Sequence, residues 1–348
     1  MEVDDMGSKL DELMAKVNKD VKDSVFVTGI PQYEYQRIPF TSPRMNYITH
    51  GGLPLGRLIE FYGEEGGGKT TSALDQIANF QQLYPDRDVL YVDAENTLDI
   101  DWARKIGVDV DAIKLYQPQT ESAEYILQVI KEATFSGEVG MWVLDSIPCL
   151  TSESDMEKDL TDAQKVAGVS GILTRFSREI VGPLAKMSCM GIGINQLRDK
   201  VGSQIPGQTS TPGGRAWKHF CTNRIKFMKG SYQDEAGKTL SRSSGEPNSQ
   251  RILVNMEKTK SCRPNHHVGF YTINYDTGID YLADLVDIAV QFGIIDKHGA
   301  WFTIIDSETG EVLKDKIQGQ ANVATALDED DELMERVETL VNDKIQNS

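Results

Sequence analysis

The sequence contains few cysteines, no long apolar run and no excess of basic residues. Its four cysteines, Cys149, Cys189, Cys221 and Cys262, form no CxxC pair, which argues against a zinc site and a disulfide framework. Because no apolar run reaches the ~18 residues that a transmembrane helix needs, we expect no membrane partner. The first residues, Met1–Asp5, are acidic and lack the layout of a signal peptide, so a cytoplasmic location is predicted.

Basic residues are outnumbered by acidic ones, 36 Lys and Arg against 53 Asp and Glu, which gives a net charge of −17. Taken over the whole chain, this balance argues against a nucleic-acid partner, because binding to phosphates is driven largely by cations. The distribution changes that inference. Residues 328–348 hold eight acidic and two basic residues, whereas residues 198–229 hold seven basic residues and one acidic residue. A local cationic track therefore remains available.

The 348 residues suffice for about two domains, or for one large core with appendages. Residues 1–23 have apolar residues at helical spacing and predict an amphipathic helix within an N-terminal arm, residues 1–44, with a short strand at 24–29. Between residues 45 and 275, apolar runs alternate with helical patterns, which predicts an α/β fold with a mostly parallel sheet. The predicted strands are at 57–62, 89–92, 141–144 and 190–194, and the predicted helices are near 69–84, 119–136 and 162–187.

Two polar segments interrupt this alternation, at residues 151–164 and 199–214. Neither has a regular period, and long irregular loops inside a compact domain are usually functional. Residues 232–249 predict a surface hairpin. Residues 276–348 predict a small second domain of mixed α and β structure that ends in an acidic helix.

The segment Gly63–Thr70 reads Gly-Glu-Glu-Gly-Gly-Gly-Lys-Thr and matches the phosphate-binding motif GxxxxGK[ST]. It lies between an apolar strand and a helical run, the context that the motif requires. Glycines let backbone N–H groups surround phosphate oxygens, Lys69 reaches the terminal phosphates and Thr70 binds Mg²⁺. A glycine-rich turn without this function would not need Lys69 and Thr70.

Carboxylates and amides follow three predicted strands, and chemistry at a bound nucleotide would use them. Asp145 ends the strand at 141–144 and is predicted to bind Mg²⁺ with Thr70. Glu95 ends a strand that we expect beside the phosphate loop, and it is the candidate for orienting the attacking water, with Asp93 as the alternative. Gln196 ends the third strand and can sense the γ-phosphate.

The order of several motifs resembles the RecA family of recombinases over about residues 45–325. The motifs are Gly51–Arg57, the phosphate loop, Asp93–Glu95, Leu98–Asp99 with Trp102–Lys105, Asp145–Ser146, Asn195–Arg198, Pro212–Gly214, Leu285–Asp287 and Gly299–Trp301. The resemblance implies a RecA-type P-loop ATPase core, an N-terminal helix-strand arm and a small α+β C-terminal domain. It also implies ATP and Mg²⁺ as ligands.

The resemblance assigns further roles residue by residue. It implies catalytic roles for Lys69, Glu95 and Gln196. Asp99 and Trp102 would hold the adenine, and Lys258 and Lys260 would reach the ATP of a neighbouring subunit. The implied ATP-binding set is Gly63, Glu64, Glu65, Gly66, Gly67, Gly68, Lys69, Thr70, Thr71, Asp99, Trp102, Lys258 and Lys260.

The two polar loops, about 152–164 and 199–214, correspond to the DNA-binding loops of the family. Near the DNA phosphates the resemblance implies Arg178, Arg198, Gly213 and Gly214. It further implies a helical filament on single-stranded DNA, exchange with duplex DNA, and assistance from single-strand-binding and loader proteins. From the charge distribution we also expect that the acidic C-terminal residues compete with DNA for the cationic track, with a merely solubilising end as the alternative.

Two other interpretations remain open. A hexameric RecA-core motor, such as a replicative helicase, shares the ATPase core, although the Pro212–Gly214 loop and the small C-terminal domain disfavour it. A regulatory filament that binds DNA without strand exchange is the other, and the sequence discriminates against it only weakly.

Overall fold

The computed structural model describes residues 9–21, 35–159, 168–199, 209–234, 237, 239–241 and 245–348. The chain divides into two units, residues 1–35 and residues 36–348. In the first unit, helix α1 (Lys9–Val21) exposes Leu10 and Leu13. The strand predicted at 24–29 lies outside the described residues. Among the helices that the structure describes, none is long and apolar enough to cross a membrane.

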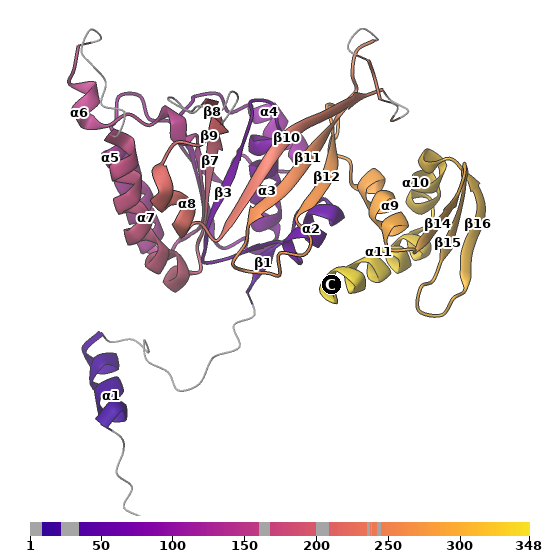
Figure 1. The fold of residues 1–348 in the computed structure, drawn as a ribbon, viewed down its shortest axis with the longest axis horizontal. Coiled ribbons are helices and arrows are strands. Elements are labelled where there is room, and N and C mark those ends of the chain that lie inside the picture. The colour runs from indigo at the N-terminus through magenta and orange to yellow at the C-terminus, as the bar shows by residue number, and fades with distance from the viewer. Residues whose placement is uncertain are drawn as a thin grey trace, which may run out of the picture. The chain divides into compact units, whose positions relative to one another are not determined.

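The second unit is built on a large sheet, which in the described part of the chain has nine strands (Figure 1). Their order is β13-β12-β11-β10-β3-β7-β6-β4-β5. Strands β10, β3, β7, β6, β4 and β5 are parallel, whereas β10 to β13 are antiparallel. The bounds are β3 (Leu58–Gly63), β4 (Asp88–Asp93), β5 (Ile113–Tyr116), β6 (Val139–Asp145), β7 (Met190–Gln196), β10 (Asn223–Gln233), β11 (Ser249–Lys258), β12 (Val268–Asn274) and β13 (Gly278–Ile279).

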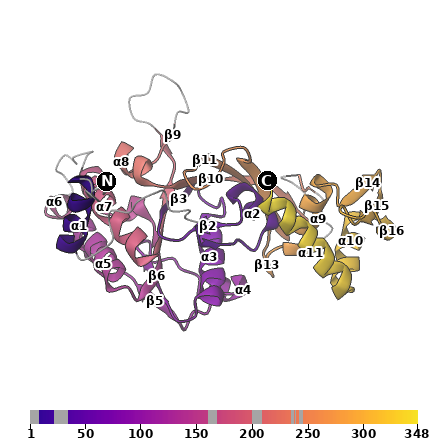
Figure 2. The same cartoon turned by 90° about the horizontal axis from the view of Figure 1, so that it is seen from below.

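Helices cover both faces of this sheet, as Figures 1 and 2 show. Successive strand residues point to opposite faces: Met141 and Val143 pack in one core, and Trp142 and Leu144 in the other. The first core includes residues of α2 (Pro43–Thr49), α3 (Lys69–Leu83) and α4 (Ile100–Ile106). The second includes residues of α5 (Ala123–Ser136), α7 (Gly168–Met187) and α8 (Gly214–Phe220). The predicted α/β class and mostly parallel sheet are confirmed.

Short elements connect these layers. Strands β1 (Arg37–Ile38) and β2 (Leu53–Pro54) pair with each other, as do β8 (Arg198–Asp199) and β9 (Thr209–Ser210). A 3-10 turn, η1 (Ile147–Cys149), and helix α6 (Glu153–Met156) follow β6. The first predicted loop therefore contains a helical turn, while residues 160–167 and 200–208 lie outside the described residues.

A third core belongs to the C-terminal region. It contains α9 (Tyr281–Gln291), the antiparallel strands β14 (Ile295–His298), β15 (Trp301–Ile305) and β16 (Val312–Gln318), and helices α10 (Gln320–Asp328) and α11 (Asp331–Gln346). The acidic end of the chain is thus α11, with Leu333, Val337, Leu340, Val341 and Ile345 buried. The predicted acidic helix is therefore present and its apolar face is part of this core, while its competition with DNA stays a prediction.

The N-terminal arm is predicted at residues 1–44. Within that range Ile38 and Phe40 are buried in the main core, and the second unit begins at Gln36. The strand that leads to Glu95, β4, was expected beside the phosphate-loop strand β3. In the structure β7 and β6 lie between them, because β3 pairs with β7 and β4 pairs with β6.

Candidate nucleotide and nucleic-acid site

The glycine-rich segment forms the turn between β3 and α3. Gly66 and Gly68 have φ angles of 64° and 84°, in the left-handed region that glycine adopts readily. A Cβ atom on Gly68 would lie 3.0 Å from the Tyr271 hydroxyl oxygen and 3.1 Å from Ile252 Cγ1, so a side chain has little room. Backbone N–H groups and the N-terminus of α3 are thus left to line the turn, as an anion requires.

Lys69 begins α3 and is buried, with 7% of its surface exposed. Its Nζ donates to the carbonyl oxygens of Glu64 at 2.6 Å and Gly63 at 3.3 Å. Burial lowers its pKa, while the charges of Asp145 and Glu95 raise it. The ammonium group is therefore held inside the turn, where a bound phosphate would meet it.

Thr70 and Asp145 meet at the end of β6. Thr70 Oγ1 and the Tyr91 hydroxyl each donate to Asp145 Oδ2 at 2.9 Å. Burial is the largest cause that raises the pKa of Asp145 to about 6; these two hydrogen bonds lower it, and the charges of Glu95 and Asp93 raise it. Crowded carboxylates beside a hydroxyl are hard oxygen ligands that a divalent cation would neutralise, so these residues fit Mg²⁺.

Glu95 lies between the ends of β6 and β7. Its Oε1 accepts from Gln196 Nε2 at 3.0 Å and from the Ser146 hydroxyl. Asp93, the alternative base, is 1% exposed and accepts from the N–H groups of Thr97 and Leu98 and from Gln117. Because those contacts occupy the Asp93 carboxylate, the structure favours Glu95 as the group that can reach a water.

A cavity of about 380 Å³ adjoins the phosphate loop. Trp102 lines it, and its indole Nε1 donates to Thr71 Oγ1 at 3.1 Å. Asp99 is not among the lining residues; it caps α4 by accepting from the Trp102 N–H at 3.0 Å. The remaining lining residues are Gly66, Gly67, Gly68, Lys69, Thr70, Thr71, Gln250, Ile252, Ile273 and Tyr275.

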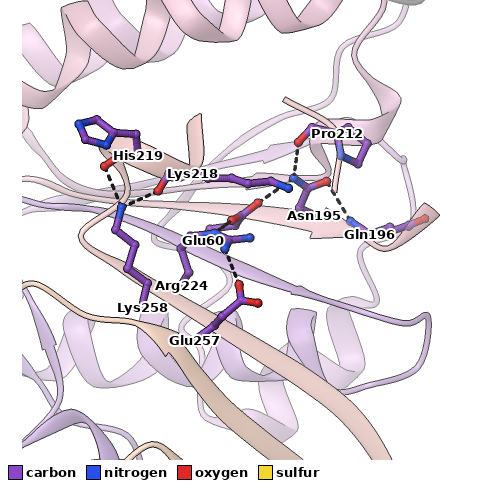
Figure 3. Close-up of polar contacts among 9 residues, drawn as sticks. All are labelled: Glu60, Asn195, Gln196, Pro212, Lys218, His219, Arg224, Glu257 and Lys258. Atoms are coloured by element: carbon purple, nitrogen blue, oxygen red, sulfur yellow. Dashed lines mark hydrogen bonds and ion pairs between the residues drawn. The ribbon is translucent and has the colours of Figure 1, made fainter. Parts of the chain in front are cut away.

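A buried polar network crosses β3 and connects its two neighbouring strands, from Asn195 on β7 to Arg224 on β10 (Figure 3). Asn195 Nδ2 donates to Glu60 Oε1 at 2.8 Å and to the Pro212 carbonyl at 3.0 Å. Glu60 is fully buried and its Oε2 accepts from Arg224 Nε at 2.5 Å. Arg224 also pairs with Glu257, next to Lys258 in the chain. The network links the residue before Gln196 to the end of the second predicted loop.

Lys258 and Lys260 lie at the C-terminal end of α8. Lys258 Nζ donates to the carbonyls of Lys218 and His219, at 2.5 and 2.8 Å, and Lys260 Nζ donates to His219 O at 3.0 Å. Burial and the neighbouring Lys260 charge lower the pKa of Lys258. Neither lysine lines the cavity at the phosphate loop of its own chain.

Of the four predicted DNA-contacting residues, the structure brings three together. Arg198, Gly213 and Gly214 line a cavity of about 560 Å³ that also borders Pro148 and Thr151. Arg178 is exposed on α7 and is not among the lining residues of this cavity.

Sequence reasoning assigned no positioning role to Glu60, Tyr91, Ser146 and Arg224, which contact the predicted residues or each other. Arg224 was counted in the cationic track, but it is buried and paired with Glu60 and Glu257. A signal existed for Glu60, because a charged residue inside the apolar strand Leu58–Gly63 needs a buried partner. The partner itself, Arg224, is 164 residues away in the chain, so no local pattern identifies it.

Two family models match most of the chain. The model of the RecA N-terminal domain matches residues 9–280, and that of the RecA C-terminal domain matches residues 283–346. Protein RecA of Chlorobaculum tepidum is 36% identical over 296 residues, covering 85% of this chain and 79% of the relative.

Protein RecA of a Thermus thermophilus strain is 32% identical over 335 residues, covering 95% of this chain and 93% of the relative. The crystal structure of the RadB recombinase matches 68% of this chain and 95% of that one, at 18% identity and a TM-score of 0.49, a similarity too weak to support an inference. The family models and the relatives together show that the chain belongs to the RecA family of recombinases.

Proposed function

We propose that this protein is an ATP-dependent DNA recombinase that forms helical filaments on single-stranded DNA, searches duplex DNA for homology and exchanges strands. The observation that carries the proposal is the 3.0 Å hydrogen bond from Gln196 Nε2 to Glu95 Oε1. It joins the candidate catalytic carboxylate to the strand that leads directly into residues 199–214, the second predicted DNA loop. A change at the γ-phosphate can therefore reach the DNA through one side chain.

In this proposal the phosphate loop and Lys69 bind the ATP phosphates, and Thr70 and Asp145 hold Mg²⁺. The cation, when bound, supplies positive charge that offsets the charge of the phosphates. Glu95 orients the attacking water and accepts its proton at a carboxylate oxygen. Gln196 donates either to Glu95, as in this structure, or to the γ-phosphate.

The geometry of Lys258 and Lys260 supports a site shared between subunits. Both lysines lie beside α8 and not at the phosphate loop of the same chain. We propose that they contact the ATP of a neighbouring copy, so that ATP binding and filament assembly favour each other. Residues 1–35 would serve as the arm between copies, and residues 276–348 as a separate C-terminal domain.

Arg198 with Gly213 and Gly214 would bind single-stranded DNA, since backbone N–H groups and a guanidinium suit phosphate oxygens. The proposed role of Arg178 at DNA is independent of that cavity. Duplex DNA would enter as the second substrate, with base pairing providing the sequence selection.

A strand-exchange assay tests the proposal. With ATP and Mg²⁺, a circular single strand and a homologous linear duplex should yield joint molecules, and a heterologous duplex should not. If strands are not exchanged but duplex DNA is unwound, and electron micrographs show closed rings, a hexameric motor would be favoured instead. Filaments without either activity would favour a regulatory role.

A further inference from the structure

The side chain of Gln250 is a buried polar group in the cavity beside the phosphate loop. The residue is 7% exposed, and its Nε2 has no hydrogen-bond partner among the described residues. Buried side-chain donors are nearly always paired, so an exception in a cavity calls for an explanation. A ligand atom that accepts this hydrogen bond would provide one.

The strand register places Gln250 two residues along β11 from Ile252, which lies against the phosphate loop at Gly68. Ile252 pairs with Tyr271, and both approach Gly68. Gln250 pairs with Ile273 one step along the same face, and two residues of strand span about 7 Å. A group bound at Gln250 is therefore displaced from the phosphates by about the length of a sugar and lies near Trp102, which also lines the cavity.

The amide offers both a donor and an acceptor at this position. The Tyr275 hydroxyl donates to Gln250 Oε1 at 3.5 Å, a long contact that leaves this oxygen a second lone pair. Glutamine pairs with adenine through two hydrogen bonds, one to N7 and one from the N6 amino group. Guanine presents two acceptors at the same edge, so the amide can satisfy only one of them.

We propose that Gln250 is a specificity-determining residue that selects adenine, with Nε2 donating to N7 and Oε1 accepting from the N6 amino group. The proposal rests on the proposed function, because it requires a nucleoside triphosphate on the phosphate loop. It adds to that function a residue that the sequence analysis did not identify. The signal was a polar residue at an inward position of β11, where Ile252, Val254 and Met256 are otherwise apolar and buried.

The test measures dissociation constants by displacement of a fluorescent ADP from the full-length protein with Mg²⁺. The competitors are ATP, 7-deaza-ATP, which lacks the N7 acceptor, and GTP. For the wild type we expect 7-deaza-ATP to bind about fivefold more weakly than ATP, and GTP about tenfold more weakly. In Gln250→Ala the three nucleotides should bind with equal, weaker affinity.

Gln128→Ala, at an exposed glutamine on α5, is the matched control and should keep the wild-type ratios. If Gln250→Ala does not fold, Gln250→Glu keeps the side-chain volume, loses the donor and should remove the preference for N7. Wild-type binding of ATP, 7-deaza-ATP and GTP with equal affinity would overturn the role of Gln250, as would a variant that keeps the preference. Failure of every triphosphate to bind the wild type would instead overturn the proposed function itself, and this proposal with it.

Discussion

Two buried aspartates have the same raised pKa in different surroundings. Asp145, at the carboxyl end of the sheet, and Asp284, on α9 where it contacts the start of α2, both have a pKa of about 6, and burial is the largest cause for each. Asp145 is held by two hydroxyls and repelled by Glu95 and Asp93. Asp284 accepts from the Ser42 hydroxyl and the Arg44 N–H, with Arg44 Nε at 3.7 Å.

The comparison distinguishes the candidate nucleotide site at Asp145 from a structural contact at Asp284, which we call the joint. At Asp284 a cation of the same chain already faces the carboxylate, so its role is to connect the core to the C-terminal domain. At Asp145 the hydrogen-bond partners are hydroxyls, and Glu95 and Asp93 add negative charge. Lys69 interacts with Asp145 only through its charge, without an ion pair among the described residues. This arrangement gains from an added cation. A perturbed pKa alone therefore does not identify a functional residue, but the partners that surround it do.

The largest expected effect comes from removing the ammonium group of Lys69 from the candidate site. Lys69→Ala should lower ATP turnover by about 10² to 10³-fold, because the phosphates lose a preorganised charge. The measurement is phosphate release in the presence of single-stranded DNA. Turnover at the wild-type rate would contradict the site, and an unchanged melting temperature would show that the variant is folded.

Glu95→Gln should separate binding from chemistry. The amide removes the proton acceptor, so turnover should fall by about 10²-fold. ATP binding should persist, and filaments should be long-lived by electron microscopy. Because Glu95 accepts hydrogen bonds from Ser146 and Gln196, loss of nucleotide binding would instead show that it is a structural residue.

Mixing two inactive variants tests whether the site is shared. Lys258→Ala/Lys260→Ala retains its own phosphate loop, and Lys69→Ala retains its own lysine pair. Co-assembled filaments should therefore recover part of the ATPase activity, measured against each variant alone. No recovery under conditions in which the two variants co-assemble would argue against lysines that act on a neighbour.

The smallest effect concerns stability at the joint. The folded-state pKa of Asp284, about 6, exceeds its ordinary value of 3.8, so the folded protein binds more protons between these values. The free energy of unfolding that this carboxyl contributes should fall as pH rises from about 4 to 6, by about 3 kcal/mol at most. Asp284→Asn keeps an acceptor for Ser42 and Arg44 and should reduce the pH dependence seen in urea titrations by this amount. The contributions of Asp145 and Asp75, whose pKa values are also raised, should remain.

Asp145→Asn provides the contrast at the site and should lower turnover, by less than Lys69→Ala does, while the protein remains folded. If instead Asp284→Asn reduced nucleotide affinity and Asp145→Asn did not, the distinction between the two regions would be wrong.

Local sequence patterns predicted many of the residues of the candidate site. Gly63–Thr70 predicts a phosphate loop because backbone freedom, a cation and a hydroxyl are all required within eight consecutive positions. The alternation of apolar runs and helical patterns predicted the parallel sheet, because a strand that is buried on both faces is a nearly continuous apolar run in the sequence. The ends of those strands pointed to Glu95, Asp145 and Gln196. In the structure Gln196 donates to Glu95, and the charge of Glu95 acts on Asp145, while the roles of the three residues stay predictions.

Strand order and side-chain partners needed the tertiary structure. No local signal places β7 and β6 between β3 and β4, because strand pairing joins distant segments. The same holds for Arg224, which compensates Glu60, and for Gln250, which shares a cavity with the phosphate loop. The acidic end could be read as a helix, but only packing showed that its apolar side belongs to a core. The periodicity of the sequence indicates which residues are buried. Which residues they pack against depends on contacts between distant parts of the chain, and only the tertiary structure shows these.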